Sequence, residues 1–268
     1  MMQQLGFKSF IMQKIPFILA ITILFMNCKS EDFTITNVKE SNLRFPKATF
    51  ELPILNGKKN ITASVNNQLI KSLFDIDVYS DYEKVFQNAR SNKENRIFNL
   101  TFLNYEINTL NDLLYSITLY TEGCGAYCEE YEQSFNFNLE NGNKINLDSI
   151  FSVMGKKKFL KEISKQKSKK INSYISKLKQ EQVLENEQIT VNQSIQLYRN
   201  CLKSLPFTTL EYLDFKIKKD SIFFLSDRCS NHAMRALDDL GDYTFSFHKS
   251  DFNIFLNKYG KKLLTKSY

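Results

Sequence analysis

The segment Leu114–Phe151, with the sequence LYSITLYTEGCGAYCEEYEQSFNFNLENGNKINLDSIF, contains the clearest structural pattern of the chain. Polar and apolar residues alternate over Ser116–Tyr120 and over Phe135–Leu139, as they do in strands with one buried face. Two cysteines bracket the loop between these strands. Asn141-Gly142 then forms a turn, because both residues tolerate positive φ, and residues 145–147 can return antiparallel. The segment therefore predicts two strands with a cysteine-bracketed loop, followed by a hairpin.

The flanking sequence predicts further strands and helices. Neighbouring strands joined by short turns pair antiparallel, so we predict the α+β class, with antiparallel sheets packed by helices on one side. Short alternating runs predict strands at 48–55, 97–105, 112–120, 213–217, 221–225 and 243–247, and helical spacing predicts helices at 61–74, 154–182, 191–202 and 250–256.

The helix predicted for residues 154–182 is long and rich in lysine, with ten lysines against two acids, Glu162 and Glu181. Its apolar residues recur at helical spacing, so the helix is amphipathic and its outer face is lysine-rich. Such a face attracts an anionic glycan, a lipid or an acidic partner. It is also typical of an ordinary solvated face in a lysine-rich protein, and this second interpretation is the one we expect.

An apolar run of 12 residues, 15–26, follows two lysines near the N-terminus and ends just before Cys28. Twelve residues are too few to span a bilayer, but they are typical of the core of a signal peptide. A cysteine directly after such a core is typical of a bacterial lipoprotein, in which Cys28 is the lipidated first residue of the mature chain. A buried cysteine in an N-terminal helix is the alternative. Translation can start at Met1 or at Met12.

We expect the chain to divide into a signal peptide at 1–27, a polar tether at 28–44 and an α+β domain at 45–268, whose halves are about 45–152 and 153–268. Residues 1–27 contain two lysines and no acid, so the mature chain has 36 − 2 = 34 basic and 29 acidic residues, a net charge of +5. We expect a membrane-anchored lipoprotein of the cell envelope, on the outer membrane. Nucleic acid is not expected as a partner, because no recognition motif for it occurs.

Several groups of residues resemble one known domain. They are the loop at 123–128 with the strand NFNL and the run ENGNKINLDSIF, the opening Phe45-Pro46 with residues 67–70, and LGDYTFSF at 240–247 with residues 250–252. Together they are similar to the extracytoplasmic domain shared by RsiV-type anti-sigma factors and PdaC-type peptidoglycan deacetylases, over most of residues 45–264. Members of that family usually have Gly-Gly-Ala-His in the loop, where this chain has Cys-Gly-Ala-Tyr.

The resemblance includes neither a polysaccharide-deacetylase domain nor a cytoplasmic sigma-binding segment. One branch of the family binds lysozyme, which implies a non-catalytic domain that binds a lysozyme-like protein or a cell-wall glycan. The alternative is an enzyme or an accessory factor that acts on peptidoglycan or another envelope polymer. We expect Tyr127, Glu129 and Glu130, which lie in or beside the cysteine-bracketed loop, to contact the ligand.

Four cysteines follow Cys28 in the chain. An even number in an exported protein predicts disulfides, for which three connectivities are possible. Cys124 and Cys128 flank only three residues and are natural partners, which leaves Cys201 with Cys229. Zinc ligation by some of these cysteines with His232 is the alternative that the spacing allows. We expect disulfides, no metal and no other cofactor.

The sequence has no recognisable catalytic constellation. A nucleophilic triad would need His232 or His248, and no nucleophile elbow, phosphate loop or dinucleotide fingerprint occurs. Glu129 and Glu130 are paired acids, but adjacent strand residues point to opposite faces, which argues against a shared role in glycoside hydrolysis. We predict no catalytic residue.

Overall fold

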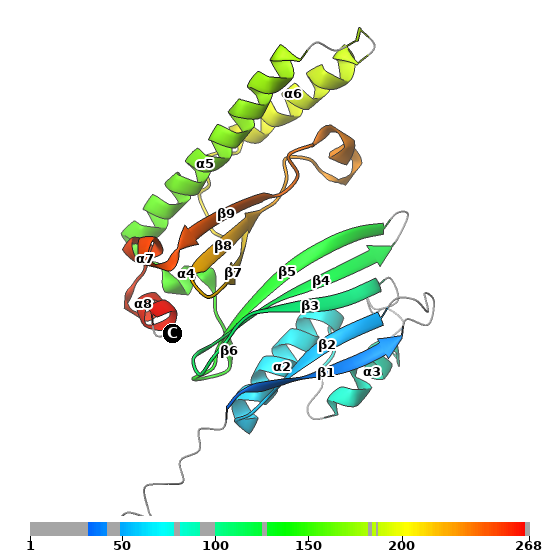
Figure 1. Cartoon of the computed structure of the whole chain (residues 1–268), viewed down its shortest axis with the longest axis vertical. Coiled ribbons are helices and arrows are strands. Elements are labelled where there is room, and N and C mark those ends of the chain that lie inside the picture. Colours follow the sequence, from blue (N-terminus) through cyan, green and yellow to red (C-terminus); the bar gives the residue numbers. More distant parts are fainter. Residues whose placement is uncertain are drawn as a thin grey trace, which may run out of the picture. The chain divides into compact units, whose positions relative to one another are not determined.

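A six-stranded sheet and a three-stranded sheet form the framework of the protein (Figure 1). The computed structural model describes residues 32–41, 49–77, 81–91, 100–124, 128–181, 184–185 and 187–265. The larger sheet has the order β1-β2-β3-β4-β5-β6, and its neighbours are antiparallel except for β2 and β3, which are parallel. Its strands are β1 (Thr34–Ser41), β2 (Thr49–Asn56), β3 (Leu100–Leu110), β4 (Leu114–Cys124), β5 (Cys128–Asn138) and β6 (Asn143–Lys144).

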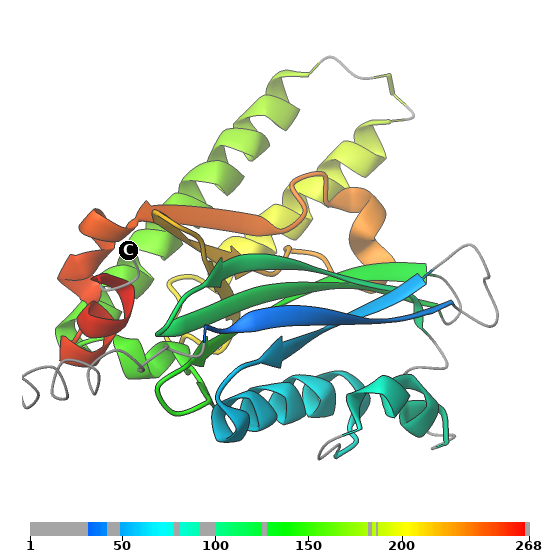
Figure 2. The same cartoon turned by 60° about the horizontal axis from the view of Figure 1, so that its bottom comes forward.

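Helices cover one face of this sheet (Figure 2). They are α2 (Lys59–Phe74), the short 3-10 helix η1 (Tyr82–Lys84) and α3 (Val85–Ser91). In α2 the buried apolar residues Val65, Leu69 and Leu73 are spaced by four, so they form one stripe that faces the sheet. The helix ends where Asp75 adopts the left-handed conformation, with φ of 51°. Side chains from these helices and from β2 to β5 form one apolar core.

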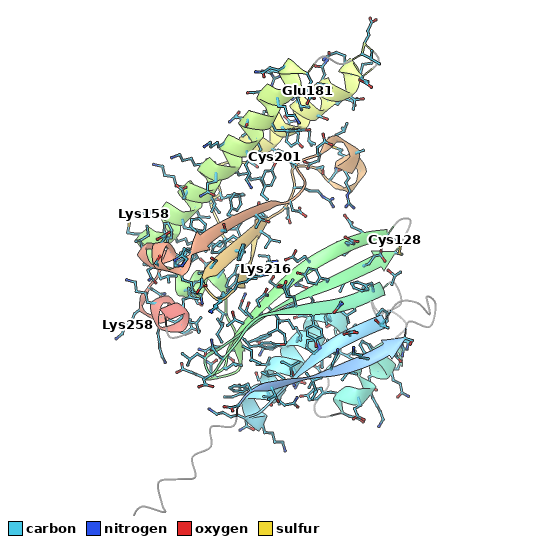
Figure 3. The ribbon with its side chains drawn as sticks, viewed as in Figure 1. Cys128, Lys158, Glu181, Cys201, Lys216 and Lys258 are labelled. Carbon is cyan, nitrogen blue, oxygen red and sulfur yellow. A yellow bond between two sulfur atoms is a disulfide. The ribbon has the colours of Figure 1, made fainter. Side chains whose placement is uncertain are left out.

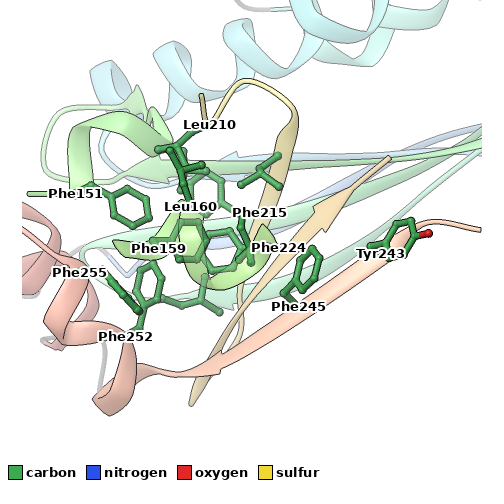
Figure 4. Close-up of a cluster of buried hydrophobic side chains, with 14 of the residues drawn as sticks. Phe151, Phe159, Leu160, Leu210, Phe215, Phe224, Tyr243, Phe245, Phe252 and Phe255 are labelled. Atoms are coloured by element: carbon green, nitrogen blue, oxygen red, sulfur yellow. The ribbon is translucent and has the colours of Figure 1, made fainter. Parts of the chain in front are cut away.

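The second sheet has the order β7-β8-β9 and is antiparallel throughout. Its own apolar core centres on the ring of Phe159, whose centroid lies 4.6 Å from that of Phe224 and 4.9 Å from that of Phe151 (Figure 4). The elements are β7 (Leu213–Ile217), β8 (Ser221–Ser226), β9 (Tyr243–His248), α4 (Leu147–Ile150), α5 (Val153–Gln180), α6 (Gln188–Lys203), η3 (His232–Leu237), α7 (Lys249–Phe252), η4 (Asn253–Phe255) and α8 (Lys258–Thr265).

The long helix α5 begins at a defined cap and a close backbone contact. The Ser152 side chain accepts a hydrogen bond from the Gly155 N–H at 3.0 Å, as an N-cap residue does. A Cβ atom on Gly155 would lie 1.9 Å from the backbone oxygen of Phe255, so only glycine lets α5 approach η4 this closely. The start of α5 is therefore fixed against residues 253–255.

The two sheets meet through polar groups rather than through an apolar layer. β7 is an edge strand, and β4 and β5 turn buried polar side chains toward it. Asn136 donates to the Phe215 carbonyl at 2.7 Å, and Ser116 accepts from the Ile217 N–H at 3.1 Å. Asp214 in turn accepts the backbone N–H of Ser134 at 2.7 Å. Side chains of the larger sheet thus form hydrogen bonds with the edge backbone of the smaller one. These bonds satisfy the buried polar groups, which would otherwise lack partners.

The α+β class predicted from the sequence is confirmed, and the structure corrects three details. Residues 34–41 lie within the stretch predicted to be a tether, yet they form β1, because backbone pairing with β2 needs few apolar side chains. The hairpin after Gly142 returns only over Asn143–Lys144, since Leu147 already begins α4. A further helix, α8, follows the predicted last helix at 250–256. The lipidation residue Cys28 and the predicted signal peptide lie outside the described residues.

Candidate ligand-binding surface

The hairpin of β4 and β5 ends in a disulfide. Cys124 and Cys128 lie directly opposite each other in the register and are bonded, with their Cα atoms 4.0 Å apart. The side chain of Tyr131, three residues further along β5, is 55% exposed. Tyr127, the predicted contact residue inside the loop, lies outside the described residues. The described part of this hairpin end therefore presents a covalently closed turn beside an exposed aromatic ring.

The carboxylate of Glu129 holds this hairpin end against the segment 227–242. Its side chain is only 13% exposed and forms an ion pair with Arg228, while the Arg235 guanidinium lies 4.0 Å away. The Tyr131 hydroxyl donates to the same carboxylate at 2.9 Å, and this hydrogen bond to an anion raises the pKa of Tyr131. Glu129 was predicted to contact a ligand directly, but its carboxylate already binds these three side chains.

Glu130, the other predicted acidic contact, has different surroundings. It is exposed and pairs in register with Glu122 of β4. Adjacent residues of a strand point to opposite sides, so Glu129 and Glu130 are not brought together. Of the predicted contact residues that the structure describes, Glu130 is the one whose side chain is exposed to solvent.

The segment 227–242 is itself joined to α6 by the second disulfide. Cys201 at the end of α6 is bonded to Cys229, with a Cα–Cα distance of 5.4 Å. Buried Asp238 accepts the Tyr198 hydroxyl and the Ser230 N–H, each at 2.8 Å. Desolvation and the nearby Asp238 charge raise the pKa of Tyr198, so its hydroxyl stays protonated and donates. The segment is thus fixed to α6 by the disulfide and by the Tyr198–Asp238 hydrogen bond, while the Ser230–Asp238 hydrogen bond lies within the segment.

A buried lysine lies beneath this segment, and the sequence analysis did not single it out. Lys167 is 5% exposed, and its Nζ donates to Ser226 Oγ at 3.0 Å and to the Asp227 carbonyl at 2.9 Å. It also lies 4.3 Å from the ring centroid of Tyr243. Burial lowers the pKa of Lys167. Its spacing of four from Ile163 and Ile171, both buried, was the signal that placed it on the inner face of α5.

The two disulfides exclude their cysteines as metal ligands. Bonded sulfurs are not thiolates, so the alternative of a zinc site with Cys229 does not fit this arrangement. No cluster of His, Cys, Asp or Glu able to hold a metal occurs within the described part of the chain. His248 accepts the Ser250 N–H at 3.3 Å and caps α7, which is a structural role. Nothing is described of the His232 side chain.

Two hollows share Tyr174 of α5 in their walls, and both border the segment 227–242. One has a volume of about 610 Å³ and lies between α5, α6 and η3, with Asp239 and Lys177 in its wall. The other has a volume of about 360 Å³ and is lined by Lys169, Lys170 and Leu240 as well as by Tyr174 and Lys177. The Tyr174 hydroxyl donates to Asp239 across the first hollow. Neither hollow is lined by a residue that the sequence predicted as a ligand contact.

No helix among the described residues is long and apolar enough to cross a membrane. No protein-family model and no curated protein matches the chain.

Two solved structures are similar to this chain in the path of their backbone. One is a member of the DUF3298 family from Bacteroides fragilis, with 13% identity and a TM-score of 0.46, covering 89% of this chain and 98% of that protein. The other is a DUF3298 family protein from Pseudomonas aeruginosa PAO1, with 9% identity and a TM-score of 0.46, covering 85% of this chain and 95% of that protein. Likeness at this level transfers neither a ligand nor a reaction to this chain.

Proposed function

We propose that this protein is an envelope lipoprotein whose domain binds a protein or glycan ligand without transforming it. In this proposal Cys28 is acylated after removal of residues 1–27, and the domain is of the RsiV/PdaC-like type that its sequence resembles. The outer membrane is the proposed location. The ligand-binding surface is the hairpin end at Cys124–Cys128 together with the segment 227–242.

One observation supports this surface more than any other, namely the ion pair of Glu129 with Arg228. It joins two segments that are each held by a disulfide, so the exposed side chains around it have fixed positions. A rigid surface with an exposed aromatic ring favours binding, because little conformational entropy is lost when a ligand is bound. Tyr131 and Arg235 are the exposed side chains on the Glu129 face of β5, and in this proposal they contact the ligand.

The resemblance makes a lysozyme-like protein the first ligand to test. The net charge of +5 on the mature chain repels a basic lysozyme at long range, so electrostatic steering would not assist that encounter. An anionic cell-wall glycan is the competing ligand, because its charge complements that of the whole chain.

Titration of the purified protein with lysozyme and with soluble peptidoglycan fragments tests the proposal. Saturable binding should weaken at least tenfold in Tyr131→Ala, the loss expected when an aromatic contact at the centre of an interface is removed. Tyr212→Ala is the matched control, since Tyr212 is 64% exposed but belongs to the turn before β7. Equal affinities of the two variants would contradict this surface.

The alternative is an enzyme or accessory factor acting on peptidoglycan or another envelope polymer. A hydrolysis and deacetylation assay with the same preparations separates it from pure binding. Turnover that is lost in His248→Ala would refute the binding proposal, because it would give catalytic work to a residue that we assign to helix capping.

A further inference from the structure

An apolar patch with lysines around it occurs at the end of the domain where α5 begins. Val153, Met154 and Ile254 have exposed fractions of 77%, 62% and 71%. The Ser152 N–H donates to the Phe255 carbonyl at 3.0 Å, and Gly155 touches the same carbonyl. The first turn of α5 is therefore held against η4, and the three apolar side chains belong to one end of the fold.

Several lysines lie close in sequence to these apolar residues. Lys157 and Lys158 come four positions after Val153 and Met154 and so lie one turn further on the same faces of α5, Lys161 comes one turn later, and Lys258 begins α8. All four are exposed, and no ion pair joins them to a carboxylate among the residues that the structure describes. By contrast, Lys156 pairs with Asp148 and Lys262 pairs with Glu140. Lysines without a carboxylate partner thus lie in or next to the segments that carry the exposed apolar groups.

The polypeptide enters the domain at this same end. Thr34, at the start of β1, pairs with Asn56, and α2 begins shortly after Asn56. A series of contacts connects the first half of α2 to α8. Ser64 and Gln68 of α2 donate to the Gly142 carbonyl at 3.1 and 2.7 Å, and nearby Glu140 pairs with Lys262 of α8 at 2.7 Å. Asn257 then donates to the Phe151 carbonyl beside α5 at 3.1 Å. Lys158 and Lys258 lie at this end in Figure 3, whereas Cys128 lies at the opposite end.

We propose that the patch of Val153, Met154 and Ile254, with its lysines, docks on an anionic lipid bilayer, and that this holds the hairpin end at Cys124–Cys128 away from the membrane. This inference rests on the proposed lipid at Cys28. Thr34 follows Cys28 by 34 − 28 = 6 residues, which reach at most about 20 Å when fully extended. An acyl anchor at Cys28 therefore keeps the start of β1 close to the lipid headgroups.

The chemistry of the patch fits a bilayer better than a soluble polyanion. A polyanion needs only cations, whereas apolar side chains beside lysines match the acyl boundary and the anionic headgroups of a membrane surface. Each lysine near an anionic surface strengthens the attraction about fivefold, so replacing two of them should weaken docking roughly 25-fold.

Tryptophan fluorescence tests the proposal, because the natural chain has no tryptophan. The full lipidated protein with Met154→Trp, reconstituted in vesicles that contain phosphatidylglycerol and brominated lipid, should show quenched and blue-shifted emission. Tyr131→Trp at the opposite end should not. Lys157→Gln with Lys158→Gln should remove the quenching of the Met154→Trp reporter, whereas Lys177→Gln with Lys179→Gln, near the other end of α5, should leave it unchanged.

Equal quenching of the two reporters would overturn the proposal. So would a blue shift of the Met154→Trp reporter that needs no vesicles and grows with protein concentration, because the patch would then join two copies of the chain. The mass of the N-terminal peptide reports the anchor separately. A lipidated Cys28 without selective quenching refutes the docking alone. An unmodified Cys28, with selective quenching on added vesicles, refutes the anchor alone.

Discussion

The side-chain amide of Asn136 donates to the backbone carbonyl of Phe215 at 2.7 Å and so joins β5 of the larger sheet to β7 of the smaller one. Asn136 is 1% exposed, and 79 residues separate the two partners. An edge strand normally leaves its outer N–H and C=O groups without partners from a sheet. Here the side chains of Asn136, Ser116 and Thr109 supply those partners.

Replacing Asn136 with alanine should destabilise the protein. The Phe215 carbonyl would lose its partner in a buried site, which costs about 1 to 3 kcal/mol. Urea unfolding measures the change. Asn60→Ala is the control, because Asn60 is exposed in the first turn of α2 and should change stability by less than about 0.5 kcal/mol. Equal effects of the two substitutions would rule out the proposed role of this hydrogen bond.

Gly155→Ala should also destabilise the protein, although alanine favours a helix by about 1 kcal/mol over glycine. The new Cβ would lie 1.9 Å from the Phe255 oxygen, so α5 would have to move away from η4. Such overpacking costs about 1 to 3 kcal/mol, and the expected net change is a loss. Asn172→Ala on the exposed face of α5 is the control. A higher melting temperature for Gly155→Ala would disprove the close contact.

The purified mature protein should contain no free thiol. The loop-entropy estimate gives about 2 kcal/mol for the Cys124–Cys128 bond and about 3.5 kcal/mol for the Cys201–Cys229 bond, because the second closes the longer loop. Replacing both cysteines of the longer pair by alanine should therefore lower the unfolding free energy more than the same change in the shorter pair. Thiol counting and peptide mapping check the pairing, and stoichiometric zinc on reduced cysteines would contradict it.

Lys167→Met should change how stability depends on pH. Burial lowers the pKa of Lys167 in the folded state below the ordinary value of 10.5. At pH values between the lowered pKa of the folded state and the ordinary pKa of the unfolded chain, the unfolded chain binds more protons than the folded one. This lysine therefore makes stability rise with pH in that range. The unfolding free energy of the natural protein should thus rise relative to that of Lys167→Met as the pH approaches 10.5. A constant difference across this range would show that Lys167 is not desolvated.

Cys28→Ser should abolish labelling of the protein by a palmitate analogue. The reason is the apolar run that ends at Cys28, as in lipoprotein signal peptides. Labelling is measured after growth of the producing bacterium with the analogue, and Cys201→Ser serves as the control that should keep the label. Undiminished labelling of Cys28→Ser would reject the proposed anchor and the envelope location that depends on it.

Local sequence pattern determined most of the secondary structure. The alternation at Ser116–Tyr120 and Phe135–Leu139 predicted β4 and β5 because period-two burial is a property of single strands. The helical spacing at 61–74 and 154–182 predicted α2 and α5 for the same kind of reason. The close spacing of Cys124 and Cys128 favoured the disulfide pairs that the structure has.

Only the tertiary structure decided what covers the polar face of β4 and β5. The alternating pattern places Ser116, Thr118 and Asn136 on one face of the two strands. From the pattern alone, such a polar face is expected to be exposed to solvent, whereas these residues are buried. Contact with β7, about 100 residues later in the chain, buries the face instead. The same holds for Lys167 and for Glu129, which bind Ser226 and Arg228 over separations of 59 and 99 residues. Their partners come from distant segments, and hydrogen bonds between distant segments leave no periodic signal in the sequence.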